Sequence, residues 1–354
     1  MLTAPKTKHP HNHLGDIGHE PIPALKCTMQ RSIGSLVLAS IALTTLMPTL
    51  AMADKWCFVV AGDGRADTRA HRADDKNGVN VTITTEIRDA VLAEKAKFLM
   101  WTGDLVSGYS KDPEAFKSQL LTWRDIMEPL YAKRIKVLPC RGNHDASSTD
   151  AWAMWDKVFT GKYALPNNGP TNEKNLTFFF SQGPVLAIGL DQYQEKGEAI
   201  NQSWLDDVLA KHKKPFVFAM GHEPAFMDGA HKDTMDASPA KRDAFWNSMI
   251  AAGSRAFFCG HDHLYDHMIV TKSEGNPGPE MHQFVAGTAG APFYKQGDYT
   301  GNNTGWKLQR VKHIDNTYGY VLVEIDGKTA TISFKGRTSP GHYEVMDSFS
   351  YSVN

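Results

Sequence analysis

The chain has 354 residues, 42% of them hydrophobic and 22% charged, with a formal net charge of -1 and a sequence pI of about 6.9. This composition is typical of a globular protein with a substantial core. The balance of charges lacks the basic excess of proteins that bind nucleic acid or membrane surfaces, so no nucleic-acid partner is indicated.

Residues 29–53 have the three parts of a secretory signal peptide. Arg31 supplies a positive start, residues 33–46 form an apolar segment, and Ala51-Met52-Ala53 is a small-residue cleavage site. The apolar segment is short for a membrane span, so a membrane anchor is the weaker alternative. We therefore expect a periplasmic or secreted protein that begins at Asp54 and keeps no stable membrane anchor after cleavage.

Residues 1–28, which precede the signal segment, are rich in proline and histidine and have no periodicity. We interpret them as an upstream extension outside the fold, such as an overlong start, although the histidines could also bind metal loosely. Residues 54–354 contain no repeat, low-complexity tract or long linker, and we expect them to form one domain.

The first part of this domain alternates buried strands with amphipathic helices. Apolar runs predict strands at residues 58–60, 98–101, 137–138, 216–218 and 257–258. Helical spacing of apolar residues predicts helices around residues 83–91, 116–130 and 204–209. Ser238 and Pro239 predict the start of another helix, and Gly253 can close it.

Strands dominate the later part of the chain. The pattern predicts strands at residues 281–285, 318–325 and 329–334, with Asp326-Gly327 as the turn of a hairpin between the last two. Two sheets packed face to face, with helices outside, fit this order of elements.

The domain contains three cysteines, Cys57, Cys140 and Cys259, each in an apolar run. An odd number argues against a full disulfide framework, so we interpret them as small buried hydrophobic residues. One disulfide among them remains an alternative in an oxidising compartment.

Five apolar runs end in a glycine that is followed closely by a residue able to bind a metal ion. The motifs are AGDGR, TGDLV, RGNHD, MGHEP and CGHDH, and their polar residues are Asp63, Asp104, Asn143, His144, Asp145, His222, His261 and His263. Each strand would deliver its donor to one edge of a sheet, where glycine lets the chain turn. One Gly-Asp is usually a turn and one histidine usually has another role, but five such motifs together indicate a metal centre.

The types of donor suggest which metals the centre would bind. Carboxylates, an amide oxygen and imidazoles suit Mn, Fe or Zn rather than a thiolate-bound metal. The donors are too many for one tetrahedral ion and enough for two divalent or trivalent ions bridged by a carboxylate. Two such ions clamp the attacking and leaving oxygens of a phosphoryl displacement and generate hydroxide near neutral pH.

The order GD, GD, GNHD, GH and GHxH resembles that of the calcineurin-like metallophosphoesterases. GHDHLYDH and the later GTAGAPFY are most similar to the purple-acid-phosphatase branch. The resemblance spans nearly the whole domain. It implies an α+β or α/β fold, a four-layer αββα sandwich of two mixed β-sheets flanked by helices, with a dinuclear metal centre at the strand ends.

The resemblance also implies a role for each candidate residue. Asp104 would bridge the two ions. One ion would have Asn143, His222 and His261 as its other ligands, and the second ion would have Asp63 and His263. His144 would bind phosphate or protonate the leaving group. Asp145 would hold the His144 ring by a hydrogen bond.

Two positions depart from the family pattern. Many members have a histidine ligand where this chain has Arg65, and purple acid phosphatases have a metal-binding tyrosine where this chain has Ser107. Asp67, Tyr109 or water could replace the missing ligand, and without a tyrosinate ligand we expect no purple colour. Arg65 either grips a substrate phosphate oxygen, which we favour, or pairs with a nearby carboxylate such as Asp67 in a weakened site.

These observations predict a phosphohydrolase in which hydroxide bridging two metal ions attacks phosphorus in a small-molecule phosphate ester. A monoester and a diester are both compatible with His144, and the oligomeric state is not indicated. His231, Tyr265 and Tyr294 could line the substrate entrance. The alternatives are a non-catalytic metal- or phosphate-binding protein on the same fold, and a hydrolase with one ion held by Asp104, Asn143, His222 and His261.

Overall fold

The computed structural model describes residues 56–67, 75–194, 199–227, 229, 231–273, 278–295, 302–303 and 305–354. The expected upstream extension and signal segment lie outside these residues. Contacts group residues 52–354 in one compact unit. Within the described ranges, no helix is both long enough and apolar enough to cross a membrane.

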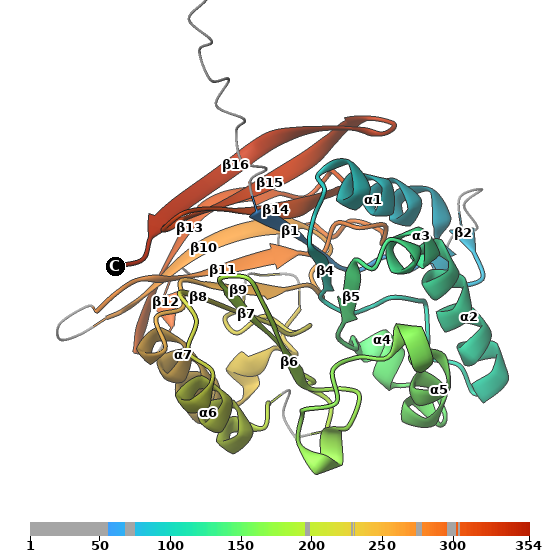
Figure 1. Cartoon of the computed structure of the whole chain (residues 1–354), viewed down its shortest axis with the longest axis horizontal. Helices are drawn as coiled ribbons and strands as arrows, with labels where there is room; N and C mark the ends of the chain where they lie inside the picture. The colour runs from blue at the N-terminus through green and yellow to red at the C-terminus, as the bar shows by residue number, and fades with distance from the viewer. Residues whose placement is uncertain are drawn as a thin grey trace, which may run out of the picture. The chain divides into compact units, whose positions relative to one another are not determined.

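Two mixed β-sheets form the centre of the fold (Figure 1). The first sheet has the order β16 (His342–Ser352), β15 (Thr329–Ser339), β14 (Gly319–Asp326), β1 (Trp56–Ala61), β4 (Phe98–Trp101) and β5 (Lys136–Pro139). The second has the order β12 (Asn302–Asn303), β13 (Trp306–Ile314), β10 (Tyr265–Lys272), β11 (Met281–Ala286), β9 (Ala256–Cys259), β8 (Phe216–Met220), β7 (Val185–Gly189) and β6 (Phe178–Gln182). A short pair, β2 (Asp75–Lys76) and β3 (Val79–Asn80), lies outside both sheets.

Helices supply the two outer layers. The α-helices are α1 (Val81–Ala93), α2 (Pro113–Ile126), α3 (Glu128–Ala132), α4 (Asn143–Ala146), α5 (Ala151–Val158), α6 (Gln202–Lys211) and α7 (Pro239–Ala251). Short 3-10 turns lie at η1 (Gly161–Tyr163), η2 (Thr171–Glu173) and η3 (Met235–Ala237). In Figure 1, α1 to α5 lie beside the first sheet, and α6 and α7 lie beside the second.

Aromatic contacts join these layers. Phe58 of the first sheet meets Phe218 of the second with ring centroids 5.3 Å apart. On the outer faces, Trp101 of β4 packs on Trp123 of α2, with 5.2 Å between ring centroids, and Phe257 of β9 packs on Phe245 of α7 at 5.1 Å. The expected four-layer αββα sandwich of two mixed sheets is therefore confirmed.

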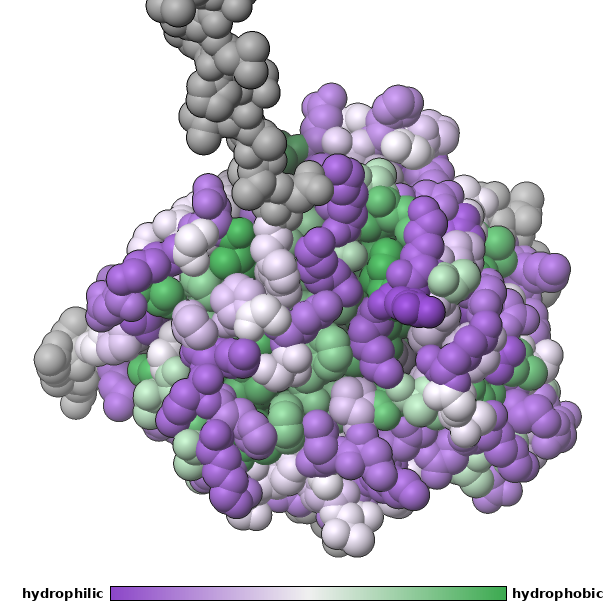
Figure 2. All heavy atoms as spheres, viewed as in Figure 1, coloured by the Kyte–Doolittle hydropathy of each residue, from purple (hydrophilic) through white to green (hydrophobic). Residues whose placement is uncertain are grey.

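The surface agrees with this burial of apolar residues. Polar residues cover most of the face drawn in Figure 2, and apolar residues show in small groups between them. Tyr109, Val311 and Val345 are the large apolar or aromatic side chains that the described part of the chain exposes most.

The strands and helices that the sequence predicted are present, with two differences. The sequence did not predict several other elements, among them β6, β7, β10, β13, β16, α4 and α5. The expected helix over residues 116–130 is divided into α2 and α3, because Pro129 favours a new helix start. The α7 helix begins at Pro239 as expected, but the Ser238 side chain makes no capping hydrogen bond. The Asp326-Gly327 hairpin turn is confirmed, since Asp326 pairs with Thr329 across it.

The three cysteines of the domain, Cys57, Cys140 and Cys259, are buried, and none of them forms a disulfide. Burial raises the pKa of the Cys57 thiol to about 11, so this thiol is a poor nucleophile near neutral pH. They serve as core residues, as the sequence analysis favoured.

One polar cluster ties the α1 layer to the terminal hairpin of the first sheet. The Glu86 carboxylate accepts two hydrogen bonds from Arg337, at 2.7 and 2.9 Å, and others from the Gly341 amide and the Tyr343 hydroxyl. Burial alone would raise the pKa of Glu86, but the bonds from Arg337 outweigh it and hold the pKa below its ordinary value of 4.5.

We expect Glu86→Gln to lower the free energy of unfolding at pH 7 by about 1–2 kcal/mol, because it removes the charge from these bonds. A carboxylate with a lowered pKa contributes stability above its ordinary pKa and loses it as the pH falls through the folded-state pKa. Urea unfolding from pH 7 to pH 3 should therefore show the two curves converging at low pH. Glu344→Gln, at an exposed position of β16, is the control and should change little at any pH.

Candidate metal centre

Five loops bring the predicted site residues together at the carboxyl ends of parallel strands. In the first sheet β1, β4 and β5 run parallel, and in the second sheet β8 and β9 run parallel. The five motifs follow the last residues of these strands. Side-chain atoms of Asp63, Asp104 and His222, one from each of three loops, all lie within 4.8 Å of one another.

Glycine is required in these loops because the site side chains occupy the space beside it. A Cβ on Gly142 would lie 2.1 Å from Asp104 Oδ1, and a Cβ on Gly260 would lie 2.2 Å from Asp63 Oδ2. Any larger residue at either position would displace a carboxylate of the site.

The His222 ring has a defined proton position. Its Nδ1 lies 2.8 Å from the Thr102 carbonyl oxygen, so Nδ1 carries the proton and donates it there. Burial lowers the pKa of His222 to about 3, which keeps the ring neutral. The Nε2 atom of His222 therefore presents a lone pair to the site.

Three electron-pair donors meet at this Nε2 atom. Asn143 Oδ1 lies 3.0 Å from it and Asp104 Oδ1 lies 3.5 Å from it. Two acceptors at 3.0 Å repel one another unless a cation lies between them, so this donor set fits a metal ion. An inverted Asn143 amide would instead form an ordinary hydrogen bond with His222, and metal binding distinguishes the two arrangements.

Tyr109 holds the Asn143 amide by a hydrogen bond. Its hydroxyl oxygen accepts a 2.8 Å hydrogen bond from Asn143 Nδ2, which directs Oδ1 toward His222. Tyr109 has a φ of 48°, a strained conformation for a tyrosine, and its ring lies edge-on to His144 with 4.5 Å between ring centroids. This conformation places the exposed Tyr109 side chain beside Asn143 and His144.

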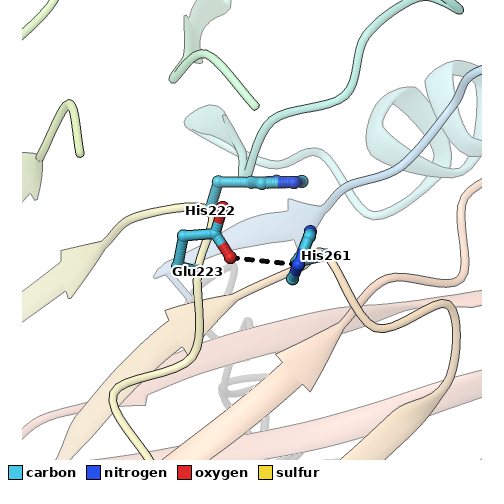
Figure 3. A group of neighbouring side chains, drawn as sticks. All are labelled: His222, Glu223 and His261. Atoms are coloured by element: carbon cyan, nitrogen blue, oxygen red, sulfur yellow. Dashed lines mark ion pairs between the residues drawn. The ribbon is translucent and has the colours of Figure 1, made fainter. Parts of the chain in front are cut away.

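The His261 ring is held by two carboxyl groups that the sequence analysis did not select, those of Glu223 and Asp233. Figure 3 shows the contact with Glu223. His261 Nε2 lies 3.1 Å from Glu223 Oε2 and 3.2 Å from Asp233 Oδ1, so Nε2 carries a proton and Nδ1 is left to bind a metal. The hydrogen bond with His261 lowers the pKa of Asp233 to about 2, whereas burial raises the pKa of Glu223 to about 8. Glu223 also belongs, with His222 and His261, to a group of three residues that could hold an ion.

His263 presents its other nitrogen to the site. Its Nδ1 lies 2.7 Å from the Pro292 carbonyl oxygen, which leaves the Nε2 lone pair facing Asp63 Oδ1 at 3.6 Å. The Tyr294 ring stacks on the His263 ring with 4.2 Å between centroids. Tyr294 therefore lies against one of the candidate ligands, and its place at a substrate entrance stays a prediction.

Arg65 lies inside the cluster rather than at its edge. Only 4% of the residue is exposed, and its Nε forms an ion pair with Asp104 Oδ2 at 3.3 Å. Its Nη2 lies 3.3 Å from both His263 Nε2 and the Tyr294 hydroxyl. The guanidinium thus contacts two of the side chains that the sequence analysis assigned to the second metal ion.

The model of the calcineurin-like phosphoesterase family matches residues 58–265, more than half of the chain. The chain belongs to this family. The family resemblance predicted from the five motifs is confirmed.

Solved structures show the same fold at low sequence identity. A purple acid phosphatase from yellow lupin (Lupinus luteus) has a TM-score of 0.59 at 17% identity, over 84% of this chain and 53% of its own. The chain thus spans about half the length of the lupin protein. No curated protein matches the chain.

Two further relatives match over most of their own length. A dimetal phosphatase from Danio rerio has a TM-score of 0.54 at 13% identity, over 84% of this chain and 99% of its own. GAP50, described as the anchor in the inner membrane complex of Plasmodium, has a TM-score of 0.55 at 15% identity, over 85% of this chain and 89% of its own. At these identities the likeness establishes the fold alone.

In this member of the calcineurin-like phosphoesterase family, His144 lies at the edge of the cluster. Its Nδ1 lies 2.5 Å from the Ser107 carbonyl oxygen, and its Nε2 lies 3.8 Å from Asp104 Oδ2. Burial lowers the pKa of His144, although the Asp104 charge opposes this shift. The ring therefore directs Nε2 toward Asp104.

Asp145 does not hold the His144 ring as the family resemblance implied. Its Oδ2 accepts hydrogen bonds from the amides of Gly142, at 2.9 Å, and Leu105, at 3.2 Å. The Ser107 carbonyl oxygen, which faces His144 Nδ1, holds the ring in place of Asp145. Burial, with the Asp104 charge, raises the pKa of Asp145 to about 8. Asp145 thus fixes the backbone that carries Asn143. Its hydrogen bonds go to backbone amides and not to the His144 ring.

Two other expected residues differ in position. Tyr265 is buried, with 1% exposed, and its hydroxyl donates to Asp347, so it does not line an entrance. His231 lies against the His261 ring, with 4.1 Å between centroids, and its Nδ1 lies 2.6 Å from Asp262 Oδ1. His231 therefore lies beside a candidate ligand, and its place at a substrate entrance stays a prediction.

We expect Tyr109→Phe to weaken Zn²⁺ or Mn²⁺ binding about 10-fold, because it removes the acceptor that orients the Asn143 amide. Competition with a chromophoric chelator measures this affinity. Tyr163→Phe removes a hydroxyl that bonds to Glu128, away from the site, and should leave the affinity unchanged. Equal affinities of Tyr109→Phe and the unmodified chain would show that Tyr109 does not position the ligand.

Proposed function

We propose that this chain is a metal-dependent hydrolase of phosphate esters. The observation that supports this most directly is the meeting of His222 Nε2, Asn143 Oδ1 and Asp104 Oδ1 without a proton between the first two. Membership of the calcineurin-like phosphoesterase family, whose members are generally phosphoester hydrolases, gives that centre its chemistry.

The chain offers donors suited to Mn, Fe or Zn. Asp104, Asn143, His222 and His261 would hold one ion, and the family resemblance adds a second ion on Asp63 and His263. Such an ion supplies Lewis-acid polarisation and neutralises charge on phosphoryl oxygens. In the first set, His222 Nε2 faces Asn143 Oδ1 at 3.0 Å and Asp104 Oδ1 at 3.5 Å. In the second set, His263 already contacts Arg65.

His144 is the residue placed to handle a proton. Its Nδ1 proton is committed to the Ser107 carbonyl, so any proton exchanged with substrate passes through Nε2. A protonated Nε2 can donate to the leaving-group oxygen of the ester, and in either state the ring can bind a phosphoryl oxygen. Arg65 adds a permanent positive charge beside Asp104, which favours an anionic substrate.

A second candidate is a non-catalytic protein that binds a metal or a phosphate ligand. The ion pair of Arg65 with Asp104 supports it, because a cation already engages the expected bridging carboxylate. The fold permits this reading, since GAP50 shares it and is described as an anchor. Turnover separates the two candidates.

We expect the chelator-treated chain to hydrolyse p-nitrophenyl phosphate or bis-p-nitrophenyl phosphate only after Mn²⁺ or Zn²⁺ is restored. The preferred substrate then distinguishes monoesterase from diesterase activity. Asp104→Asn should lower kcat/KM at least about 100-fold, because it removes charge from the centre of the donor set.

Asp326→Asn keeps a favourable turn residue in the β14–β15 hairpin and should retain full activity. Absence of turnover on both substrates with every metal tested would favour the non-catalytic candidate.

We also propose export to the periplasm or the medium, on the basis of the apolar segment and the cleavage site that follows it. The full chain expressed in a Gram-negative bacterium should yield a product whose mass corresponds to a start at Asp54. Ala51→Leu should block this cleavage, because the site requires a small residue. An unprocessed chain in the membrane fraction would instead indicate an anchor.

A further inference from the structure

The two positions of the expected two-ion centre differ in what their donor atoms face. At the first position, His222 Nε2 and Asn143 Oδ1 face one another at 3.0 Å with no proton to share. At the second position, the Nε2 lone pair of His263 faces a guanidinium nitrogen of Arg65 at 3.3 Å. The second position thus already has a cationic group of the chain beside its donors.

Arg65 contacts the same atoms that a second ion would use. Its Nη2 meets His263 Nε2, and its Nε meets Asp104 Oδ2, the carboxylate oxygen that does not face His222. The remaining nitrogen, Nη1, donates to the carbonyl of Ala66 at 3.3 Å. The planar guanidinium thus joins the two loops that a shared ion would otherwise join.

The backbone on both sides of Arg65 holds the side chain in this place. Arg65 forms an isolated β-bridge with Val79, and the Ala66 amide donates to the Gly78 carbonyl at 3.0 Å. The Asn80 amide donates to the Gly64 carbonyl, also at 3.0 Å. Because the segment is anchored to residues 78–80, moving the guanidinium out of the cluster would require side-chain rotation within a site where Arg65 is only 4% exposed.

Charge also opposes a second ion beside Arg65. Asp63 and Asp104 carry two negative charges when ionised, and Arg65 cancels one of them. With one divalent ion, the two carboxylates, Arg65 and the ion together carry a small net charge. With two divalent ions, Arg65 and both ions would be three cations around only two carboxylates. Like charges in a buried site are strongly unfavourable.

We infer that the guanidinium of Arg65 takes the place of the second metal ion, so that the working site holds one ion, bound by Asp104, Asn143, His222 and His261. The inference rests on the proposed metal-dependent function of this site and changes its composition. The second cation of the family's centre is here supplied by the protein chain itself.

Metal content tests this directly. The full chain is stripped with a chelator, equilibrated with excess Mn²⁺, freed of unbound ion and analysed for manganese per chain by mass spectrometry. We expect one ion in the unmodified chain and two in Arg65→His, which removes the guanidinium and adds an imidazole donor beside Asp63. The electron paramagnetic resonance signal should change from that of isolated Mn²⁺ to that of a spin-coupled pair.

Two controls complete the experiment. Arg65→Lys keeps a cation at this position and should still bind one ion. Arg134→His adds a histidine at an exposed position distant in sequence from Arg65 and should also bind one ion. This control shows whether an added imidazole by itself increases the metal content.

Two tightly bound ions in the unmodified chain would overturn the inference, and so would a folded Arg65→His variant that binds only one. If Arg65→His does not fold, the number of manganese ions bound by the unmodified chain and by Arg65→Ala still tests the inference. The result is separable from the proposed function, because a chain with one ion and no turnover contradicts the hydrolase but supports the role of Arg65. A chain that binds no ion contradicts both.

Discussion

The arrangement of the site depends on two neighbouring buried carboxylates, those of Asp63 and Asp104. Burial and the neighbouring Asp104 charge raise the pKa of Asp63 well above its ordinary value. Burial acts on Asp104 in the same way, but His222, His144 and Arg65 outweigh it and lower the pKa of Asp104. Such a pair is stable only when positive charge or hydrogen-bond donors surround it. The Arg65 guanidinium, the imidazole rings and the backbone amides supply this positive charge and these hydrogen bonds.

The two sheets make this arrangement possible because they bring loops distant in sequence to one edge. Three of the expected ligands, Asp63, Asp104 and His261, have positive φ values of 61°, 49° and 69°. Each such conformation costs on the order of 1–3 kcal/mol and persists only where its surroundings impose it. Bonds between loops do so here: the Asp63 amide donates to the Gly103 carbonyl at 3.0 Å, and the Gly260 amide donates to the His222 carbonyl at 2.9 Å.

The sequence predicted the fold and the cluster well because both depend on local patterns. Apolar runs that end in glycine and a polar residue identify strand ends, and parallel strands bring those ends together. Arg65 was recognised as unusual, but its partner could not be chosen: Asp67 is closer in sequence, whereas the ion pair is formed with Asp104 across two strands.

The supporting contacts were harder to predict because they depend on backbone geometry or on residues without a motif. Asp145 follows His144 directly, yet the short α4 helix turns its carboxylate toward the amides of Gly142 and Leu105. Glu223 could have been noticed, since it follows His222 in the sequence. Asp233 lies in a polar loop where nothing marks it as a partner of His261.

Main-chain carbonyls hold three of the site histidines. The carbonyl groups of Thr102, Ser107 and Pro292 each face an Nδ1 atom. The tautomer of these rings is therefore encoded in the course of the backbone and not in the identity of neighbouring side chains. A substitution at position 102, 107 or 292 leaves the main-chain carbonyl in place, so the tautomers of the three rings are protected from changes of side chain at these positions.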